Sequence, residues 1–159
     1  MSKMTLDSFC RFVDLYQSLG LEVFIDGGWC VDALVGKQTR KHEDVDIAMS
    51  HDDMPKLRAE LEKKGFILKS TDDWRECNFV IGHPDGREVD FHTFRFDDKG
   101  NNVYGVAYER SHLTGSANIN GRNIKCIDPV VLIDYHTHYE PDEDDYHDVK
   151  LLCEKFNQP

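Results

Sequence analysis

Apolar residues recur at two spacings along the chain, and the two spacings predict different elements. Near the N-terminus they recur every three or four positions, which predicts a helix capped by Thr5 or Asp7 and stopped by Gly20. Residues 22–25 are β-branched and aromatic, which predicts a strand, and residues 29–34 predict the first turns of a second helix. The chain therefore begins as helix, strand and helix.

The middle of the chain predicts a strand, a helix and a hairpin. Acidic and apolar residues alternate over residues 44–47, as in a strand with one buried face. Pro55 marks the start of a surface helix that Gly65 terminates, and a short strand follows. Residues 78–82 and 87–92 are strand-like and flank a Pro-Asp-Gly turn, so we expect them to pair as a hairpin.

The C-terminal third predicts a second hairpin and two helices. Asn120-Gly121 lies between short β-like runs, and Asp128-Pro129 opens a helix. A last helix would run over residues 144–156 with an apolar face. Residues 97–102 form a polar loop that lacks the ligand order and the closing Glu of a calcium loop. Strands and helices mixed in this way predict an α+β fold.

Composition narrows the class of protein. A chain of 159 residues suffices for one domain with a real core, or for a small domain with a helical lobe. It has no long apolar run and no signal peptide, so we expect a soluble, cytoplasmic protein without a membrane partner. The formal charge of −11 argues against nucleic acid, because phosphate binding depends on Lys and Arg. An acidic surface would also attract a cationic small molecule, although solubility explains the charge equally well.

The cysteines indicate neither a disulfide framework nor a zinc ribbon. Their number is odd, and no Cys-x-x-Cys pair is present. We therefore expect reduced thiols in the core or at the surface. The five residues are Cys10, Cys30, Cys77, Cys126 and Cys153.

The pair Asp44 and Asp46 carries most of the functional information. On a strand, residues two apart share a face, and two like charges that close are unfavourable unless a cation lies between them. Oxygen ligands of this kind suit Mg²⁺, which takes one or two protein carboxylates together with substrate phosphates. The spacing therefore indicates the chemistry of phosphoryl or nucleotidyl transfer.

Gly27-Gly28 supports the phosphate part of this interpretation. The two glycines lie between a predicted strand and a predicted helix, where bare backbone N–H groups can approach an anion. By itself a glycine pair more often serves a tight turn. Lys37, Arg40 and Lys41 lie between the glycines and the acidic pair, and this combination favours phosphate binding.

A third carboxylate lies on the second strand of the first predicted hairpin. Val89 and Phe91 alternate with Glu88, Asp90 and His92, so one face is apolar and the other acidic. A solvated strand face explains this pattern at least as well as a site does. If the strand lies beside the Asp44 strand, however, Asp90 completes a cluster that can hold metal and accept a proton.

The run from Asp26 to Ile47 resembles the signature of the antibiotic nucleotidyltransferases, the lincosamide and 2″-aminoglycoside adenylyltransferases of the DNA polymerase β superfamily. The similar elements are a glycine pair, an aromatic residue, a helix and Arg-x-His-x-Asp-x-Asp, in this order and spacing. The resemblance continues through residues 88–92, similar to the family's third-carboxylate strand, and into residues 136–140 and 147–150. It covers nearly the whole chain, and the length fits the lincosamide-type members.

This resemblance implies a polymerase β-type nucleotidyltransferase fold, with a mixed β-sheet, flanking helices and a small C-terminal helical part. Residues 1–95 would form the nucleotidyltransferase core, and residues 96–159 a hairpin and helices that complete the acceptor site within one compact unit. The implied enzyme is a Mg²⁺-dependent nucleotidyltransferase. It would move AMP from ATP to a hydroxyl of a small cationic antibiotic, a lincosamide or an aminoglycoside. A homodimer is compatible with the sequence.

The resemblance also implies roles for the three aspartates. Asp44 and Asp46 would hold Mg²⁺ against the triphosphate of the nucleotide. Asp90 would contact a second Mg²⁺ and take the proton of the acceptor hydroxyl, which requires it to lie within hydrogen-bond reach of that hydroxyl.

Four further residues are candidates for holding the triphosphate. Gly27, Gly28 and Arg40 would position it, because this chemistry is mostly positioning and charge neutralisation. Lys150 is a weaker candidate, since it also fits a solvated position on the last helix.

The acidic loop and the histidines of the C-terminal part leave alternatives open. The acidic run either favours the N-terminus of the last helix or recognises an amine-bearing acceptor; its members are Glu140, Asp142, Glu143, Asp144 and Asp145. A zinc site is less favoured than packing or hydrogen bonding, because no Cys or His lies at ligand spacing nearby. The histidines without an assigned role are His42, His92, His136, His138 and His147.

Two other classes of function stay open at this point. The first is a minimal nucleotidyltransferase that modifies a protein or another small molecule; the glycine-tryptophan signature and the C-terminal similarity argue against it. The second is a metal- or nucleotide-binding module without catalysis. The intact set of three aspartates argues against that class, because loss of catalysis would tend to remove one of them.

Overall fold

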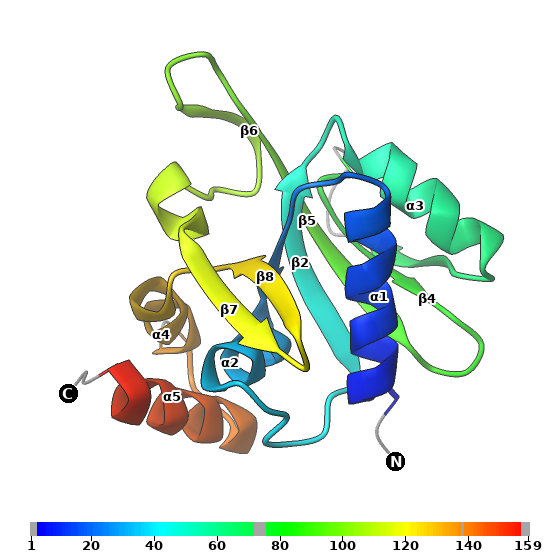
Figure 1. Cartoon of the computed structure of the whole chain (residues 1–159). Helices are drawn as coiled ribbons and strands as arrows, with labels where there is room; N and C mark the ends of the chain where they lie inside the picture. Colours follow the sequence, from blue (N-terminus) through cyan, green and yellow to red (C-terminus); the bar gives the residue numbers. More distant parts are fainter. Residues whose placement is uncertain (1–2, 72–75, 138, 157–159) are drawn as a thin grey trace.

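The computed structural model describes residues 3–71, 76–137 and 139–156, and eight strands form one mixed sheet (Figure 1). The strands are β1 (Val23–Asp26), β2 (Asp44–Ser50), β3 (Ile67–Thr71), β4 (Asn78–Gly82), β5 (Glu88–Phe96), β6 (Asn102–Gly105), β7 (Gly115–Ile119) and β8 (Arg122–Cys126). Their order is β3-β4-β5-β2-β1-β8-β7, and β6 pairs with β5 outside this path.

Five α-helices accompany the sheet within the described residues. They are α1 (Leu6–Ser18), α2 (Gly27–Val35), α3 (Met54–Lys63), α4 (Pro129–Thr137) and α5 (Glu143–Phe156), and a 3₁₀ turn spans Arg110–Leu113. In Figure 1, α1 lies beside β2 on the near side of the sheet, α3 lies toward the β4 side, and α2, α4 and α5 gather at the opposite lower end. This mixed sheet with flanking helices confirms the fold class expected from the sequence.

The centre of the sheet is β2, and its pairing fixes the position of the acidic residues. It runs parallel to β5 and antiparallel to β1, while β1 runs parallel to β8. The register places Asp46 opposite Asp26 of β1 on one side and opposite Asp90 of β5 on the other. Three carboxylates on neighbouring strands therefore lie in one row across the sheet.

The opposite face of the same strands forms the hydrophobic core. Val45 and Ile47 of β2 and Phe91 of β5 are at most 1% exposed, and Phe9 of α1 is fully buried with them. Burial of a large apolar side chain contributes roughly 1.5–3 kcal/mol. The same alternation therefore places the aspartates on one face of these strands and buries apolar side chains on the other face, which stabilises the strands.

Several element boundaries follow signals that the sequence contains. Thr5 caps α1, where its side chain accepts the Ser8 N–H at 3.1 Å, as one of the two predicted caps. Asn120 and Gly121 have φ of 50° and 81°, as the predicted two-residue turn between β7 and β8 requires. Asp128 caps α4, because its side chain accepts the Val130 N–H. These local signals confirm the predicted hairpin and helix starts.

The C-terminal residues contribute to the same sheet as the N-terminal ones, since β7 and β8 extend it beyond β1. The proposed division into residues 1–95 and 96–159 stays a prediction. In the parts of the chain that are described, no helix combines the length and the apolar character needed to cross a bilayer.

Candidate active site

The site is built on one face of three neighbouring strands. Asp26, Asp46 and Asp90 are register partners across β1, β2 and β5. Asp44 lies two positions before Asp46 on the same face of β2, opposite Glu88 of β5. The structure therefore brings together Asp44, Asp46 and Asp90 on one face, as the parallel placement of the two strands required. Their catalytic and metal-binding roles stay predictions.

One group of side chains in this row has the spacing of a metal site. Asp46, Asp90 and His92 offer ligand atoms that all lie within 4.8 Å of one another, and the described residues contain no other such group. His92 Nε2 lies 3.5 Å from Asp90 Oδ1, and His92 Nδ1 lies 3.1 Å from the carbonyl of Ile47. His92 was a residue without an assigned role, and its ring is now seen beside Asp90.

The electrostatics of the row fit a bound cation. Burial, and after it the charges of Asp44, Asp90 and Asp26, raise the pKa of Asp46 well above its ordinary value. Burial and the charges of Asp90 and Glu88 likewise raise the pKa of Asp44. A divalent cation would remove this penalty, because it favours the charged form of each carboxylate. Crowded oxygen donors of this kind match the preference of Mg²⁺.

Gly27 and Gly28 allow the start of α2 to lie against the charged residues. Gly27 has φ of +60°, and a Cβ built on it would collide with the carboxylate of Asp46. A Cβ on Gly28 would collide with Nη2 of Arg40 and would lie 2.9 Å from the ring of His42. The N–H of Gly27 donates to Oδ1 of Asp26 at 2.7 Å, so this donor is already occupied. A phosphate role for the two glycines stays a prediction.

Arg40 lies beside the start of α2, in the linker of residues 37–43 that leads into β2. Its Nε and Nη2 donate to the two carboxylate oxygens of Asp148 in α5, at 3.0 and 2.9 Å. Nη1 donates to the carbonyl of Lys41 at 3.1 Å and lies 3.6 Å from Asp144. The structure thus places Arg40 next to Gly28, as its predicted role needs, and also pairs it with the last helix.

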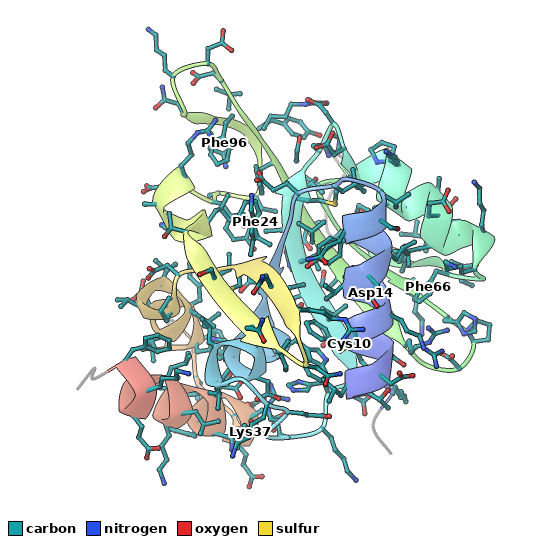
Figure 2. The ribbon with its side chains drawn as sticks, viewed as in Figure 1. Cys10, Asp14, Phe24, Lys37, Phe66 and Phe96 are labelled. Carbon is teal, nitrogen blue, oxygen red and sulfur yellow. The ribbon has the colours of Figure 1, made fainter. Side chains whose placement is uncertain are left out.

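Two other linker residues are tied to buried Asp32 of α2. Nε2 of His42 lies 2.6 Å from Oδ2 of Asp32, and the His42 ring packs on Trp29 with centroids 4.4 Å apart. The Thr39 hydroxyl donates to Asp32 and lies 2.9 Å from Nε2 of His147. Figure 2 marks the start of this linker by Lys37, close to α5. His42 and His147 therefore hold the linker that leads into β2.

The acidic loop before α5 is partly used inside the fold. Asp142 accepts the N–H of Asp145, and Asp145 in return accepts the N–H of Asp142, which is a capping box. Asp145 also accepts the Tyr139 hydroxyl at 2.8 Å. These contacts support the explanation that Asp142 and Asp145 stabilise the N-terminus of the helix. Glu140, Glu143 and Asp144 are exposed.

The remaining candidates belong to the C-terminal part of the chain. Lys150 is exposed on α5, two residues from Asp148 and hence on a different side of the helix. His136 bonds to the carbonyl of Leu132 at 2.9 Å and lies 3.6 Å from Asp148, which supports hydrogen bonding over zinc. His138 lies outside the described residues. The phosphate role of Lys150 stays a prediction.

Three residues of the site had no role in the sequence interpretation. Asp26 is the residue before the glycine pair, and its position at the end of a predicted strand was a usable signal. Asp148 has helical spacing to Leu152 in α5, which indicates a buried face. Tyr108 lies in an irregular segment, and nothing in the sequence around it indicates that it reaches Asp26.

Comparison with known proteins identifies similar sequences over most of the chain. The model of the aminoglycoside-2″-adenylyltransferase family matches residues 9–152. A lincosamide resistance protein of Staphylococcus haemolyticus is 30% identical over 145 residues, which are 88% of this chain and 89% of that protein. A 2″-aminoglycoside nucleotidyltransferase of Klebsiella pneumoniae is 40% identical over 45 residues, 28% of this chain and 25% of that protein.

Solved structures show the same fold. A crystal structure of a lincosamide antibiotic adenylyltransferase with lincomycin bound has a TM-score of 0.81 at 26% identity, and the match covers 93% of this chain and 96% of that chain. A crystal structure of a 2″-aminoglycoside resistance enzyme in complex with adenylyl-2″-tobramycin has a TM-score of 0.75 at 22% identity, over 93% of this chain and 87% of that chain. These matches confirm the expected polymerase β-type nucleotidyltransferase fold.

Proposed function

The chain belongs to the aminoglycoside-2″-adenylyltransferase family of nucleotidyltransferases, and we propose that it transfers AMP from ATP to a hydroxyl of a small antibiotic in a Mg²⁺-dependent reaction. The observation that carries this proposal is the set of carboxylates Asp44, Asp46 and Asp90 on one face of β2 and β5. Transfer of a nucleotidyl group needs a cluster of this kind, because the triphosphate must be held and its charge neutralised.

The metal site we propose uses Asp44, Asp46 and Asp90. The pKa values of Asp44 and Asp46 are raised by burial and by the charges of neighbouring carboxylates, which supports a site that binds a cation. Mg²⁺ bound there would offset the negative charge of the triphosphate and make its α-phosphorus easier to attack. His92 is suited to orient Asp90, since Nε2 of its ring lies 3.5 Å from that carboxylate.

The chemical step we propose is an in-line displacement at the α-phosphorus. Asp90 accepts the proton of the acceptor hydroxyl, and the freed oxygen forms a bond to the α-phosphorus. The bond from this phosphorus to the bridging oxygen of the β-phosphate breaks, and pyrophosphate leaves. The products are a nucleotidylated antibiotic and pyrophosphate, and Asp90 returns its proton to solvent.

The phosphate-binding residues we propose lie at the start of α2. Gly27 and Gly28 keep this helix start free of side chains, and the N-terminus of a helix favours anions. Arg40 is next to Gly28 and keeps N–H groups beyond those bonded to Asp148. Lys150 would contribute only at longer range, since it is exposed on another side of α5.

The acceptor we propose is a lincosamide. The lincosamide resistance protein is similar over 89% of its length, whereas the 2″-aminoglycoside enzyme is similar over only 25%. Asp145 and Asp148 are buried and hydrogen-bonded inside the fold, so they are not available for the ammonium groups of an aminoglycoside. We further propose that the enzyme acts in the cytoplasm, where ATP and Mg²⁺ are present.

Mass spectrometry of reaction mixtures tests this proposal. The purified chain is incubated with ATP, Mg²⁺ and a panel of lincosamides and aminoglycosides, with the other three nucleoside triphosphates and an EDTA sample as controls. We expect a mass increase of one AMP on lincosamides only, with pyrophosphate in equal amount. Modification of aminoglycosides alone would contradict the acceptor class. Transfer to no drug of either class would contradict the proposed activity.

A further inference from the structure

The last helix places a buried carboxylate against the linker that leads into β2. The side chain of Asp148 is only 1% exposed, and it belongs to the buried face of α5. Its two oxygens accept Nε and Nη2 of Arg40 at 3.0 and 2.9 Å. On the other side, Nε2 of His136 from α4 lies 3.6 Å from Oδ2. Asp148 thus joins α4, α5 and the linker at one point.

The paired geometry fixes the plane of the Arg40 guanidinium. A bidentate contact through Nε and Nη2 holds both the direction and the rotation of the group. The carbonyl of Lys41 takes one N–H of Nη1, so each terminal nitrogen keeps one N–H beyond these bonds. Nη2 is also the atom that a Cβ on Gly28 would strike, so this nitrogen, which keeps one N–H, lies at the start of α2.

The ion pair between Arg40 and Asp148 is better explained as a way to orient the Arg40 side chain than as a source of stability. Removing two charges from water costs free energy that their attraction repays only in part, so a buried ion pair is a weak source of stability. Asp144 shows the contrast, because it faces the same guanidinium at 3.6 Å but is 65% exposed. The buried partner can hold the guanidinium in one orientation, and the exposed partner cannot.

We propose that Asp148 is a positioning residue for the nucleotide, and that it acts by holding Arg40 with its free N–H groups toward the triphosphate at the start of α2. This inference rests on the proposed function, in which Arg40 contacts phosphate. It assigns to the C-terminal helix a part in nucleotide binding. The acceptor half of the site does not depend on the pair.

A thermodynamic cycle tests the inference. Calorimetry measures the Kd of the non-hydrolysable nucleotide α,β-methylene-ATP with Mg²⁺ for wild type, Arg40→Ala, Asp148→Asn and the double variant. We expect Arg40→Ala and Asp148→Asn each to raise this Kd about tenfold, the scale of one charged hydrogen bond. In the Arg40→Ala background, Asp148→Asn should raise the nucleotide Kd by less than a further factor of about two, because Asp148 no longer has Arg40 to position. The Kd of lincomycin without nucleotide should stay unchanged throughout.

Two further variants keep the test decisive. Asp144→Asn removes the exposed partner of the same guanidinium and should leave the nucleotide Kd within about twofold of wild type. Arg40→Lys keeps the positive charge opposite Asp148 but lacks the planar fork, so it preserves the charge balance of the core while losing the fixed orientation. We expect it to raise the nucleotide Kd nearly as much as Arg40→Ala.

The possible results separate the inference from the proposed function. If Arg40→Ala weakens nucleotide binding and Asp148→Asn does not, the positioning role of Asp148 is wrong while the role of Arg40 stands. Wild-type nucleotide affinity in Arg40→Lys would also overturn the inference. If Arg40→Ala itself leaves nucleotide affinity unchanged, the phosphate role of Arg40 is wrong. Additive effects in the double variant would show that Asp148 acts by another route.

Discussion

The hydroxyl of Tyr108 donates a hydrogen bond of 2.6 Å to Oδ2 of Asp26, directly beside the row of metal-site carboxylates. Oδ1 of Asp26 accepts the N–H of Gly27 at 2.7 Å, so both oxygens of this carboxylate have a donor. Burial and the neighbouring Asp26 raise the pKa of Tyr108 well above its ordinary value, and the phenol stays protonated. Asp26 therefore adds negative charge next to Asp46 while its own oxygens are occupied.

Tyr108→Phe should change the metal site as well as stability. The substitution leaves Oδ2 of Asp26 without its donor, which costs about 1–3 kcal/mol when the group is buried. The released oxygen then competes for the cation, so the Mg²⁺ concentration for half-maximal activity should shift. Denaturant unfolding and a Mg²⁺ titration measure the two effects. Tyr135→Phe is the matched control, because it removes a hydroxyl whose hydrogen bond is to His112 and leaves the donor of Asp26 in place. Identical behaviour of Tyr108→Phe and wild type would contradict a role for this bond.

Asp46→Asn should abolish transfer without destabilising the metal-free protein. Asp46 lies among Asp26, Asp44 and Asp90, and its pKa is raised by burial and then by the crowding of these charges. Removing one charge relieves the repulsion, so in EDTA the variant should be at least as stable as wild type at neutral pH. Added Mg²⁺ should stabilise wild type and have little effect on the variant. Full turnover of the variant, or full wild-type activity in excess EDTA, would disprove the metal site.

Gly27→Ala tests the close approach of α2 to the carboxylates. Gly27 and Gly20 both have left-handed φ angles, +60° and +70°. A Cβ at Gly27 would collide with Asp46, whereas nothing lies within 4 Å of a Cβ at Gly20. Gly20→Ala should therefore cost only the backbone strain, about 1 kcal/mol. Gly27→Ala should cost clearly more in unfolding free energy and should also lower kcat. Equal costs at the two positions would show that the space beside Asp46 is not limiting.

The sequence was sufficient for features that depend on local patterns. Alternation over Asp44 to Ile47 predicted which side chains share a face of the strand, and this is confirmed; the condition set for Asp90, that its strand lies beside this one, is met. Asn120-Gly121 predicted its hairpin in the same way, because turn geometry is set by the two residues themselves. A single sequence is most reliable for features that a few neighbouring residues determine.

The contacts that shape the site join distant residues, and the sequence contains no local signal for them. Arg40 and Asp148 are 108 positions apart, and Asp26 and Tyr108 are 82 positions apart. Their pairing depends on how α5 and the segment after β6 pack on the sheet. The glycine pair is a second example. Its sequence suggested anion binding, and the structure adds that a side chain at position 27 would collide with Asp46. Such requirements arise only from tertiary packing.

His136→Gln should alter how stability depends on pH. Burial opposes the charge on His136, but hydrogen bonds to Asp148 and Leu132 outweigh it and raise the pKa above the ordinary 6.5. A raised pKa in the folded state means that protonated His136 stabilises the protein fully below about pH 6.5. This contribution is lost as the pH rises through the folded-state pKa. Urea unfolding across this range should show the loss in wild type and not in His136→Gln. His83→Gln, between β4 and β5, is the control.

Asp90→Asn separates binding from chemistry, because it keeps the shape of the side chain but removes a basic oxygen and one negative charge. Mg²⁺ and nucleotide should still bind through Asp44 and Asp46, so the Kd of a non-hydrolysable nucleotide should change little. The chemical step should slow by roughly 10²-fold or more, the usual contribution of a positioned general base.

The pH profile and a matched variant then decide whether Asp90 is that base. In wild type, kcat should rise with pH as the base loses its proton, and Asp90→Asn should lack this rise. Glu88→Gln is the control, since Glu88 lies on the same face of β5 two positions away and opposite Asp44; it should keep the rise in kcat. If Asp90→Asn retains near-normal kcat with the same pH dependence, the proton goes elsewhere. Glu88 and His92 are then the first groups to test, because they share the strand face and flank Asp90.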